Sequence, residues 1–167
     1  SVTETIRQWL ERSRRHEHVQ VGFYGGSFSC LSENRQLRLL HAVSGYLRSG
    51  EVHSVRISTR PDCISKTVLD RLHDHGVRTI ELGCQSMDDT VRDRNRRGHS
   101  LAQSLVASDL ISQYGMELGV QLMVGLPGET TCSFINGIKQ LVVMRPDFVR
   151  LYPALVVDRT EMATMYY

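Results

Sequence analysis

A chain of 167 residues is long enough to form one domain with a buried core. Hydrophobic residues make up 41% of it and charged residues 23%, as in ordinary globular proteins, and a net charge of +2 is too small to indicate nucleic-acid binding by itself. Because no apolar run reaches membrane-spanning length and the first residues do not resemble a signal peptide, we expect a cytoplasmic protein without a membrane partner.

The cysteines are few and widely spaced, with no C-x-x-C pair: Cys30, Cys63, Cys84 and Cys132. This spacing is typical of reduced thiols rather than of a disulfide framework. The chain begins at Ser1 without a methionine, so we expect a fragment or a processed form of a longer protein.

The first helix and the first strand are expected near the N-terminus. Apolar residues recur at helical spacing over residues 2–15, and a basic run over residues 12–18 is interpreted as the solvated end of this helix. The first strand follows over about residues 19–24. Ser32 is then placed to cap a helix over residues 33–48.

A second strand is expected over residues 54–58 and must end at Pro61, which cannot donate a hydrogen bond to a neighbouring strand. A helix with apolar residues at helical spacing comes next, and Gly76 fits the position just after its end. The third strand is expected over residues 78–82.

A polar stretch rich in arginine leads to a helix that starts at Leu101 and closes at Gly115. The fourth strand is expected over residues 117–124, and Thr130 or Thr131 can cap the helix after it. The last expected elements are a strand over residues 148–155 and a short helix over residues 158–167.

The resulting order is strand–helix repeated four times and then a final strand. Strands that alternate with helices in this way predict parallel neighbours joined by right-handed crossovers. Two α/β architectures fit: an open doubly wound sheet and an incomplete (β/α) barrel with outer helices. We favour the barrel, as a single domain over residues 1–167, because glycine and polar residues follow the first four strands and would converge on one mouth.

Six short stretches, most of them at the predicted strand ends, stand out along the chain: Tyr24–Phe28, Ile57–Asp62, Glu81–Ser86, Arg97–Ser100, Gln121–Glu129 and Val149–Pro153. In this order and spacing they resemble the radical S-adenosylmethionine (SAM) enzymes. Within that superfamily the pattern is most similar to the branch that holds the catalytic subunit of elongator and the oxygen-independent coproporphyrinogen oxidases. The resemblance covers nearly the whole chain from Val19 onward.

The resemblance implies a partial, six-stranded (β/α) barrel that holds SAM beside a [4Fe–4S] cluster. The family binds this cluster through three cysteines spaced C-x-x-x-C-x-x-C, and no three cysteines of this chain have that spacing. We therefore expect a truncated core that lacks the first strand and the cluster loop. The parent would cleave SAM reductively to a 5′-deoxyadenosyl radical, whereas this chain as written has no cluster ligands and should be inactive.

The first two strand ends fit the methionyl part of SAM. Main-chain carbonyls around Gly25 and Gly26 can accept from the ammonium with no side chain in the way. Ser27 stands where many relatives have Glu, which makes this contact depend more on the backbone. Arg60 can bind the carboxylate through two donors, with Ser58 nearby. The alternative for Arg60 is a surface ion pair with Asp62.

The other strand ends fit the nucleoside part. Gln85 and Gln121 can both donate to and accept from the ribose hydroxyls. Gln121 lies among apolar residues and needs a partner, which is either the ligand or a neighbouring strand. Val124 and Gly125 offer an apolar shelf with exposed main chain to the adenine, and the resemblance places Tyr152 beside the same base.

The basic loop before Leu101 has two interpretations. Its side chains could face an anionic substrate such as RNA phosphates, or they could form a solvated surface, which is the preferred interpretation. The residues concerned are Arg92, Arg94, Arg96, Arg97 and His99. The substrate stays open between tRNA and a small molecule.

Two other function classes stay open. A non-radical α/β protein could bind phosphate or a nucleotide at a glycine-rich turn, although no G-x-G-x-x-G or G-x-x-x-x-G-K-[ST] motif is present. A non-catalytic scaffold could instead associate with itself through the exposed edges of a truncated barrel. Cys30 and Cys63 could recruit a metal at the rim, but loop thiols are the simpler interpretation, and we expect no metal ligands.

Overall fold

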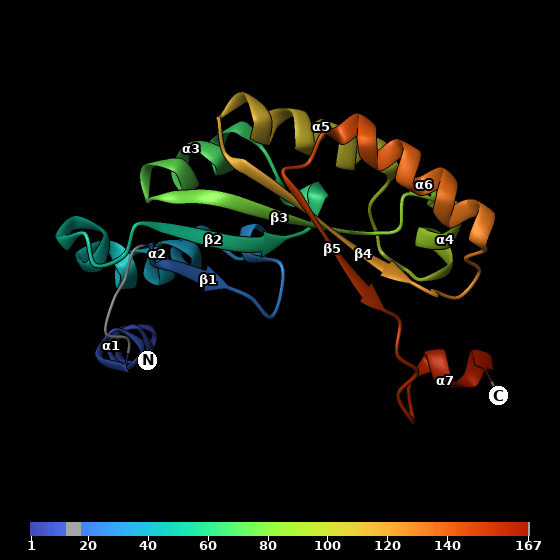
Figure 1. Cartoon of the computed structure of the whole chain (residues 1–167), viewed down its shortest axis with the longest axis horizontal. Coiled ribbons are helices and arrows are strands. Elements are labelled where there is room, and N and C mark those ends of the chain that lie inside the picture. The colour runs from blue at the N-terminus through green and yellow to red at the C-terminus, as the bar shows by residue number, and fades with distance from the viewer. Residues whose placement is uncertain (13–17, 167) are drawn as a thin grey trace.

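The computed structural model describes residues 1–12 and 18–166. Within them, parallel strands form one sheet whose spatial order follows the chain, from β1 at one edge to β5 at the other (Figure 1). The strands are β1 Gln20–Phe23, β2 Ser54–Thr59, β3 Val77–Gln85, β4 Glu117–Val124 and β5 Phe148–Pro153.

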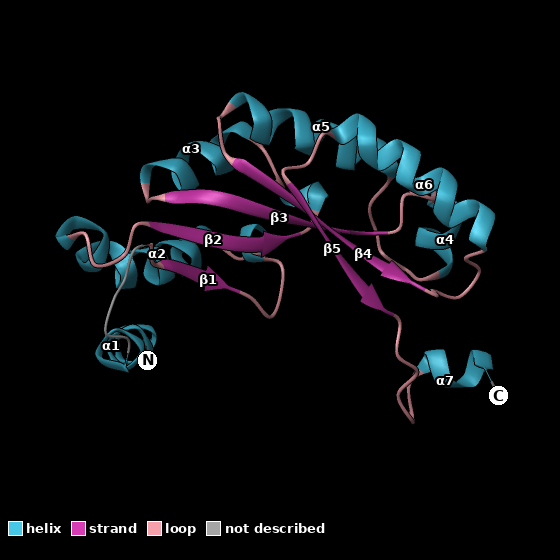
Figure 2. Cartoon of the chain, in the orientation of Figure 1, coloured by secondary structure: helices cyan, strands magenta, loops and turns pink. Residues whose placement is uncertain are grey.

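The helices follow the strands in the expected alternation, and α3, α5 and α6 lie together on one face of the sheet (Figure 2). A doubly wound sheet needs helices on both faces and a reversal of strand order, so this arrangement is a half-barrel, as predicted. The α-helices are α1 Val2–Arg12, α2 Glu33–Ser49, α3 Lys66–Asp74, α4 Asp89–Arg94, α5 Leu101–Gln113, α6 Thr131–Met144 and α7 Glu161–Tyr166. Two short 3₁₀ helices, η1 Phe28–Cys30 and η2 Pro61–Cys63, follow β1 and β2.

Local signals explain where the helices begin and end. Ser100 and Thr130 each form a capping box with the residue three positions later, which satisfies the free N–H groups at the starts of α5 and α6. Gly50 ends α2 with a φ of 78°, a left-handed conformation that costs glycine little. These ends agree with the sequence predictions.

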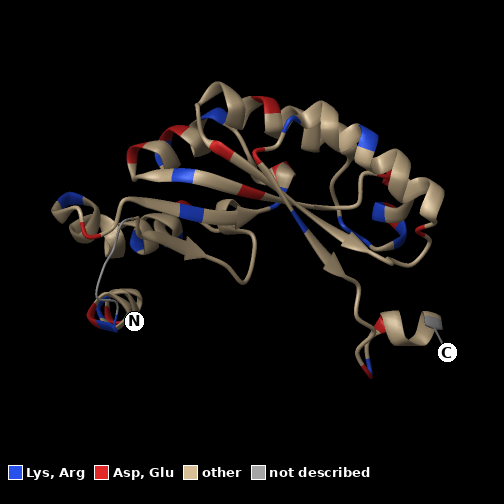
Figure 3. Cartoon of the chain, in the orientation of Figure 1, with Lys and Arg blue, Asp and Glu red and all other residues tan. Residues whose placement is uncertain are grey.

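The two faces of the sheet differ in chemistry because side chains alternate along each strand. The outer face carries buried apolar side chains such as Ile57, Leu82 and Val120, which form the core with the helices. The inner, concave face carries polar and charged side chains, and Figure 3 shows charged residues along the strands themselves. The hydrophobic core of the described residues therefore lies on the helix side, and the inner face is polar.

One cysteine prediction is wrong. Cys30 and Cys63 form a disulfide with their Cα atoms 5.2 Å apart, although 33 positions separate them in the sequence. The parallel pairing of β1 with β2 brings η1 and η2 together at the same edge, which the sequence spacing does not reveal. Among the described residues, Cys84 is free and buried and Cys132 is free and exposed.

The remaining differences are local. α1 is described up to Arg12, and the predicted continuation to residue 15, with most of the basic run, lies in residues 13–17, outside the described residues. The polar stretch after β3 contains the short helix α4, which was not predicted.

β1 and β5 are the sheet edges, as expected. None of the described helices has the length and apolar character needed to cross a bilayer.

Candidate functional site

The polar strand ends gather at one edge of the sheet. Because all neighbouring strands are parallel, their carboxyl ends meet at the same rim of the half-barrel. Ser58 and Gln121, predicted from different strands, are joined by a hydrogen bond of 3.3 Å. The expectation that these strand ends share one rim is met for Ser58 and Gln121.

A buried carboxylate lies below this rim, at the centre of the inner face. The side chain of Glu81 on β3 is fully buried, and both of its oxygens have partners from other strands. Oε1 accepts from the Tyr24 hydroxyl at 2.8 Å and from Arg56 Nη1 at 3.1 Å. Oε2 accepts from Gln121 Nε2 at 2.7 Å and forms an ion pair with Arg150 Nε at 3.1 Å. The cost of burying this charge is therefore offset by two arginines and two neutral donors.

Two glycines on the inner face make room for the aromatic rings around Glu81. A Cβ at Gly22 would lie 2.6 Å from the Tyr24 ring, which folds back over β1 to reach the carboxylate. A Cβ at Gly119 would collide with the Phe148 ring and lie 3.0 Å from Glu81 Cγ. Both positions therefore favour glycine for packing reasons.

The same environment acts on the hydroxyl of Tyr24. Partial burial, together with the hydrogen bond to Glu81, raises the pKa of Tyr24 above its usual value. The hydroxyl therefore stays protonated at neutral pH and keeps donating to the carboxylate.

Gln121 has a protein partner, one of the two alternatives that the sequence left open. Its amide nitrogen donates to Glu81 and to Ser58, which lie on two neighbouring strands. Gln85 lies close by, because its amide nitrogen is 3.1 Å from the place that a Cβ of Gly83 would occupy. The two glutamines expected to bind the ribose thus lie over the same glycine.

Arg60 forms the ion pair that was the alternative to ligand binding. Its guanidinium contacts both carboxylate oxygens of Asp62, at 2.9 and 2.6 Å, and donates to the carbonyl of Gly98 at 3.3 Å. Arg97 lies near enough that burial and the charge of Arg60 together lower its pKa. A role for Arg60 in binding a ligand carboxylate stays a prediction.

The turn after β1 is anchored from one side. Gly25, with a φ of 99°, and Gly26 are exposed, and a Cβ at either would meet no atom within 4 Å. Beyond Ser27, Ser29 bonds to Thr59 through its main-chain N–H at 3.2 Å and its hydroxyl at 2.5 Å. These bonds and the adjacent disulfide tie the loop to the end of β2, and the glycines themselves face open space.

The predicted adenine shelf lies at the end of β4. Val124, at the end of β4, and Tyr152, near the end of β5, are 41% and 42% exposed. The main-chain N–H of Gly125 donates to Glu129 Oε2 at 2.7 Å. A pocket of about 300 Å³ lies next to this end, between the α4 loop and α7, with Met123 and Leu126 in its lining. None of the ten predicted site residues lines that pocket.

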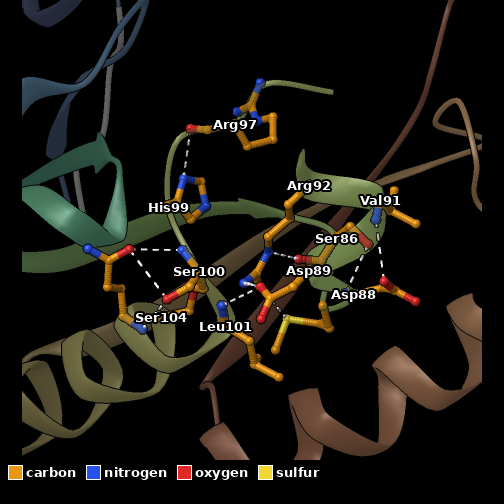
Figure 4. Close-up of polar contacts among 12 residues, drawn as sticks. Ser86, Asp88, Asp89, Val91, Arg92, Arg97, His99, Ser100, Leu101 and Ser104 are labelled. Atoms are coloured by element: carbon orange, nitrogen blue, oxygen red, sulfur yellow. Dashed lines mark hydrogen bonds and ion pairs between the residues drawn. The ribbon is translucent and has the colours of Figure 1, made fainter. Parts of the chain in front are cut away.

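The basic loop is divided between the interior and the surface: Arg92 and His99 are buried, as Figure 4 shows for the contacts of Arg92, whereas Arg94 and Arg96 are exposed. The side chain of Arg92 is fully buried, donates to the carbonyl of Ser86 at 2.5 Å and pairs with Asp89 at 3.1 Å. Arg96 forms an ion pair with Glu161 of α7 at 2.8 Å. The interpretation of a solvated basic surface is therefore wrong for Arg92, whose guanidinium instead holds the start of α4 against the core.

His99 is buried beside this cluster. Its Nδ1 lies 3.1 Å from the carbonyl of Arg97, so the proton of the neutral ring is on that nitrogen (Figure 4). Its Nε2 is buried without a hydrogen-bond partner among the described residues. Burial, reinforced by nearby arginines, lowers the pKa of His99.

Glu81, Arg56 and Arg150 were not among the predicted site residues. The available signal was their alternation: each is a charged residue inside a predicted strand, on the face opposite its apolar neighbours. Three such residues on strands β2, β3 and β5 of one sheet indicate a shared polar face, but their mutual contact depends on the register.

The thiols of the described residues do not fit an iron–sulfur cluster. Cys30 and Cys63 are joined to each other, Cys84 is buried in the core, and burial raises the pKa of its thiol. Within the described residues no group of three or more His, Cys, Asp or Glu side chains could hold a metal ion. The described residues therefore supply no set of ligands for such a cluster.

Comparisons with known proteins agree on one family. The model of the Radical SAM superfamily matches residues 2–141. Over 113 residues the chain is 31% identical to the tRNA uridine(34) acetyltransferase of Methanocaldococcus infernus, a match that covers 66% of this chain and 21% of that protein.

Two solved structures have the same fold. The Elp3 protein of Methanocaldococcus infernus, with an N-terminal deletion, gives a TM-score of 0.82 at 24% identity. The match covers 99% of this chain and 43% of the Elp3 chain. Coproporphyrinogen III oxidase of Escherichia coli gives a TM-score of 0.74 at 21% identity, with coverages of 93% and 36%. The chain thus spans less than half the length of these relatives, and the predicted resemblance to this branch is confirmed.

Proposed function

The chain belongs to the radical SAM superfamily, and from that premise we propose that it binds SAM at the carboxyl rim of the half-barrel. The observation that carries the proposal is the gathering of Ser58, Gln85 and Gln121 at one rim above a polar inner face. A ligand with an amino acid at one end and a nucleoside at the other needs such a row of different polar groups.

The residues divide by the part of SAM that they suit. The carbonyls around Gly25 and Gly26 suit the ammonium, because the turn is open and has no side chains. Arg60 suits the carboxylate only if the ligand competes with Asp62 for its guanidinium. Gln85 and Gln121 suit the ribose hydroxyls, and the exposed end of β4 suits the adenine.

Reductive cleavage of SAM needs an electron, which a [4Fe–4S] cluster supplies in this superfamily. The described thiols do not fit such a cluster, so that chemistry would require cysteines from outside this chain. What this chain contributes on its own is the recognition and orientation of SAM.

Calorimetric titration with SAM tests the proposal directly. We expect weak binding by the wild-type chain, and about tenfold weaker binding by Gln121→Ala, because the loss of one well-placed hydrogen bond costs roughly 1 kcal/mol or more. Arg60→Ala should weaken SAM binding by a similar factor and should leave the binding of adenosine, which has no carboxylate, unchanged.

Arg78→Ala is the matched control for Arg60→Ala. Arg78 is an exposed arginine at the opposite end of the sheet, where it donates to main-chain carbonyls. Its removal should not change the affinity for SAM. Equal affinities in Arg60→Ala, Gln121→Ala and the wild type would remove these two residues from the site.

A further inference from the structure

Two carboxamides meet over Gly83, which has no side chain on the inner face of β3. A Cβ at Gly83 would lie 3.1 Å from Gln85 Nε2 and 4.0 Å from Gln121 Oε1. Gln85 reaches this place through a left-handed backbone, with a φ of 65°, where the register between β3 and β4 shifts. The missing side chain therefore leaves a small cradle with an amide donor on one side and a carbonyl acceptor on the other.

The orientation of the Gln121 amide is set by Glu81. The carboxylate of Glu81 is paired with Arg56 and Arg150, so its oxygens act as acceptors. The Gln121 amide must therefore turn its nitrogen toward Glu81, and its Nε2 donates to Glu81 Oε2 at 2.7 Å. The carbonyl oxygen must then point away from Glu81, toward Gly83, and no hydrogen bond to it is found among the described residues.

We propose that Glu81 is a positioning residue that holds the Gln121 amide so that the Gly83 cradle offers an acceptor beside a donor to a vicinal diol. The inference rests on the proposed function and specifies one part of it, the recognition of the ribose. Each hydroxyl of a diol can donate and accept, so the pair matches a carbonyl oxygen next to an amide nitrogen. A nucleoside without these hydroxyls gains nothing from the cradle.

The test compares adenosine with 2′,3′-dideoxyadenosine, which differ only in the diol, as competitors of SAM in calorimetric titrations. The wild-type chain should prefer adenosine by about tenfold, the value of roughly one or two ligand hydrogen bonds. Glu81→Gln keeps the size of the side chain but replaces a carboxylate, which can only accept, with an amide that can present either an oxygen or a nitrogen to Gln121. The orientation of the Gln121 amide is then no longer fixed. In this variant the preference should fall below about twofold, and the affinity for dideoxyadenosine should stay unchanged.

Glu117→Gln is the matched control. Glu117 is a half-exposed glutamate on the same face, near the amino end of β4, and lies 3.7 Å from Arg56 without contacting Gln121. This variant should keep the full preference for adenosine. In a Gln121→Ala background, Glu81→Gln should have no further effect on the preference, because the residue it positions is gone.

The outcomes separate the two proposals. If Glu81→Gln weakens both nucleosides equally, or leaves the preference intact, Glu81 does not position the amide, and SAM binding by the chain still stands. If the wild-type chain binds neither SAM nor adenosine, the proposed function is wrong. In that case the side-chain amide ¹⁵N–¹H signals of Gln121 in the ligand-free protein test whether Glu81 orients this amide. Glu81→Gln should shift these signals, and unshifted signals would overturn the inference.

Discussion

Replacing Glu81 with alanine should destabilise the fold strongly. The carboxylate is fully buried and has two arginine partners and two neutral donors, all at 3.1 Å or less. Removing one partner of a buried charge pair costs about 3–5 kcal/mol. The side chains of Arg56 and Arg150 are 20% and 40% exposed, so water can solvate them after the loss. We therefore expect a loss of about 3 kcal/mol, at the lower end of that range.

The measurement is equilibrium unfolding in urea, followed by circular dichroism, with the slope m checked for two-state behaviour. Glu117→Ala is the control, because the Glu117 side chain is 45% exposed, lies 3.7 Å from Arg56 and accepts one neutral hydrogen bond, from Thr79 at 2.7 Å. A partly exposed ion pair of this kind contributes about 0–1 kcal/mol and the hydrogen bond from Thr79 about 1 kcal/mol, so the control should lose less stability than Glu81→Ala. Equal midpoints for Glu81→Ala and Glu117→Ala would refute the view that the inner face is organised around a buried carboxylate.

Three further predictions concern the fold around the site. Gly119→Ala should lower the free energy of unfolding in urea by about 1–3 kcal/mol, because its Cβ would collide with the phenyl ring of Phe148 on β5. Gly45→Ala, in open space on α2, should instead raise the free energy of unfolding by about 0.5–1 kcal/mol. An unchanged stability in Gly119→Ala would contradict the packing. Reduction of the Cys30–Cys63 disulfide, which spans 33 positions, should lower the unfolding free energy by about 3–4 kcal/mol, and a midpoint unaffected by dithiothreitol would count against it. Burial lowers the pKa of His99, so its neutral ring supports the fold above about pH 6.5 and this support is lost as the pH falls below that value. His99→Gln should flatten the acid side of the stability profile, and an identical slope would show that other groups cause it.

The site could be predicted from the sequence only in part. The strand ends at Ser58, Gln85 and Gln121 were found because glycine and polar residues interrupt apolar runs, which is a local pattern. Glu81 and its arginines were missed because each is a single charged residue within a strand. Such a residue has meaning only when the register places it beside the others.

The sequence by itself determined the order of the elements and the polarity of each strand face, because hydrophobic periodicity and capping residues act over a few neighbouring positions. Only the tertiary structure decided the contacts. The partners of Glu81 come from the other four strands or the turns after them, Cys30 meets Cys63 across two strand ends, and Arg92 is buried although it lies in a basic stretch. These contacts join residues far apart in the chain, and their geometry depends on register and sheet curvature rather than on any local pattern.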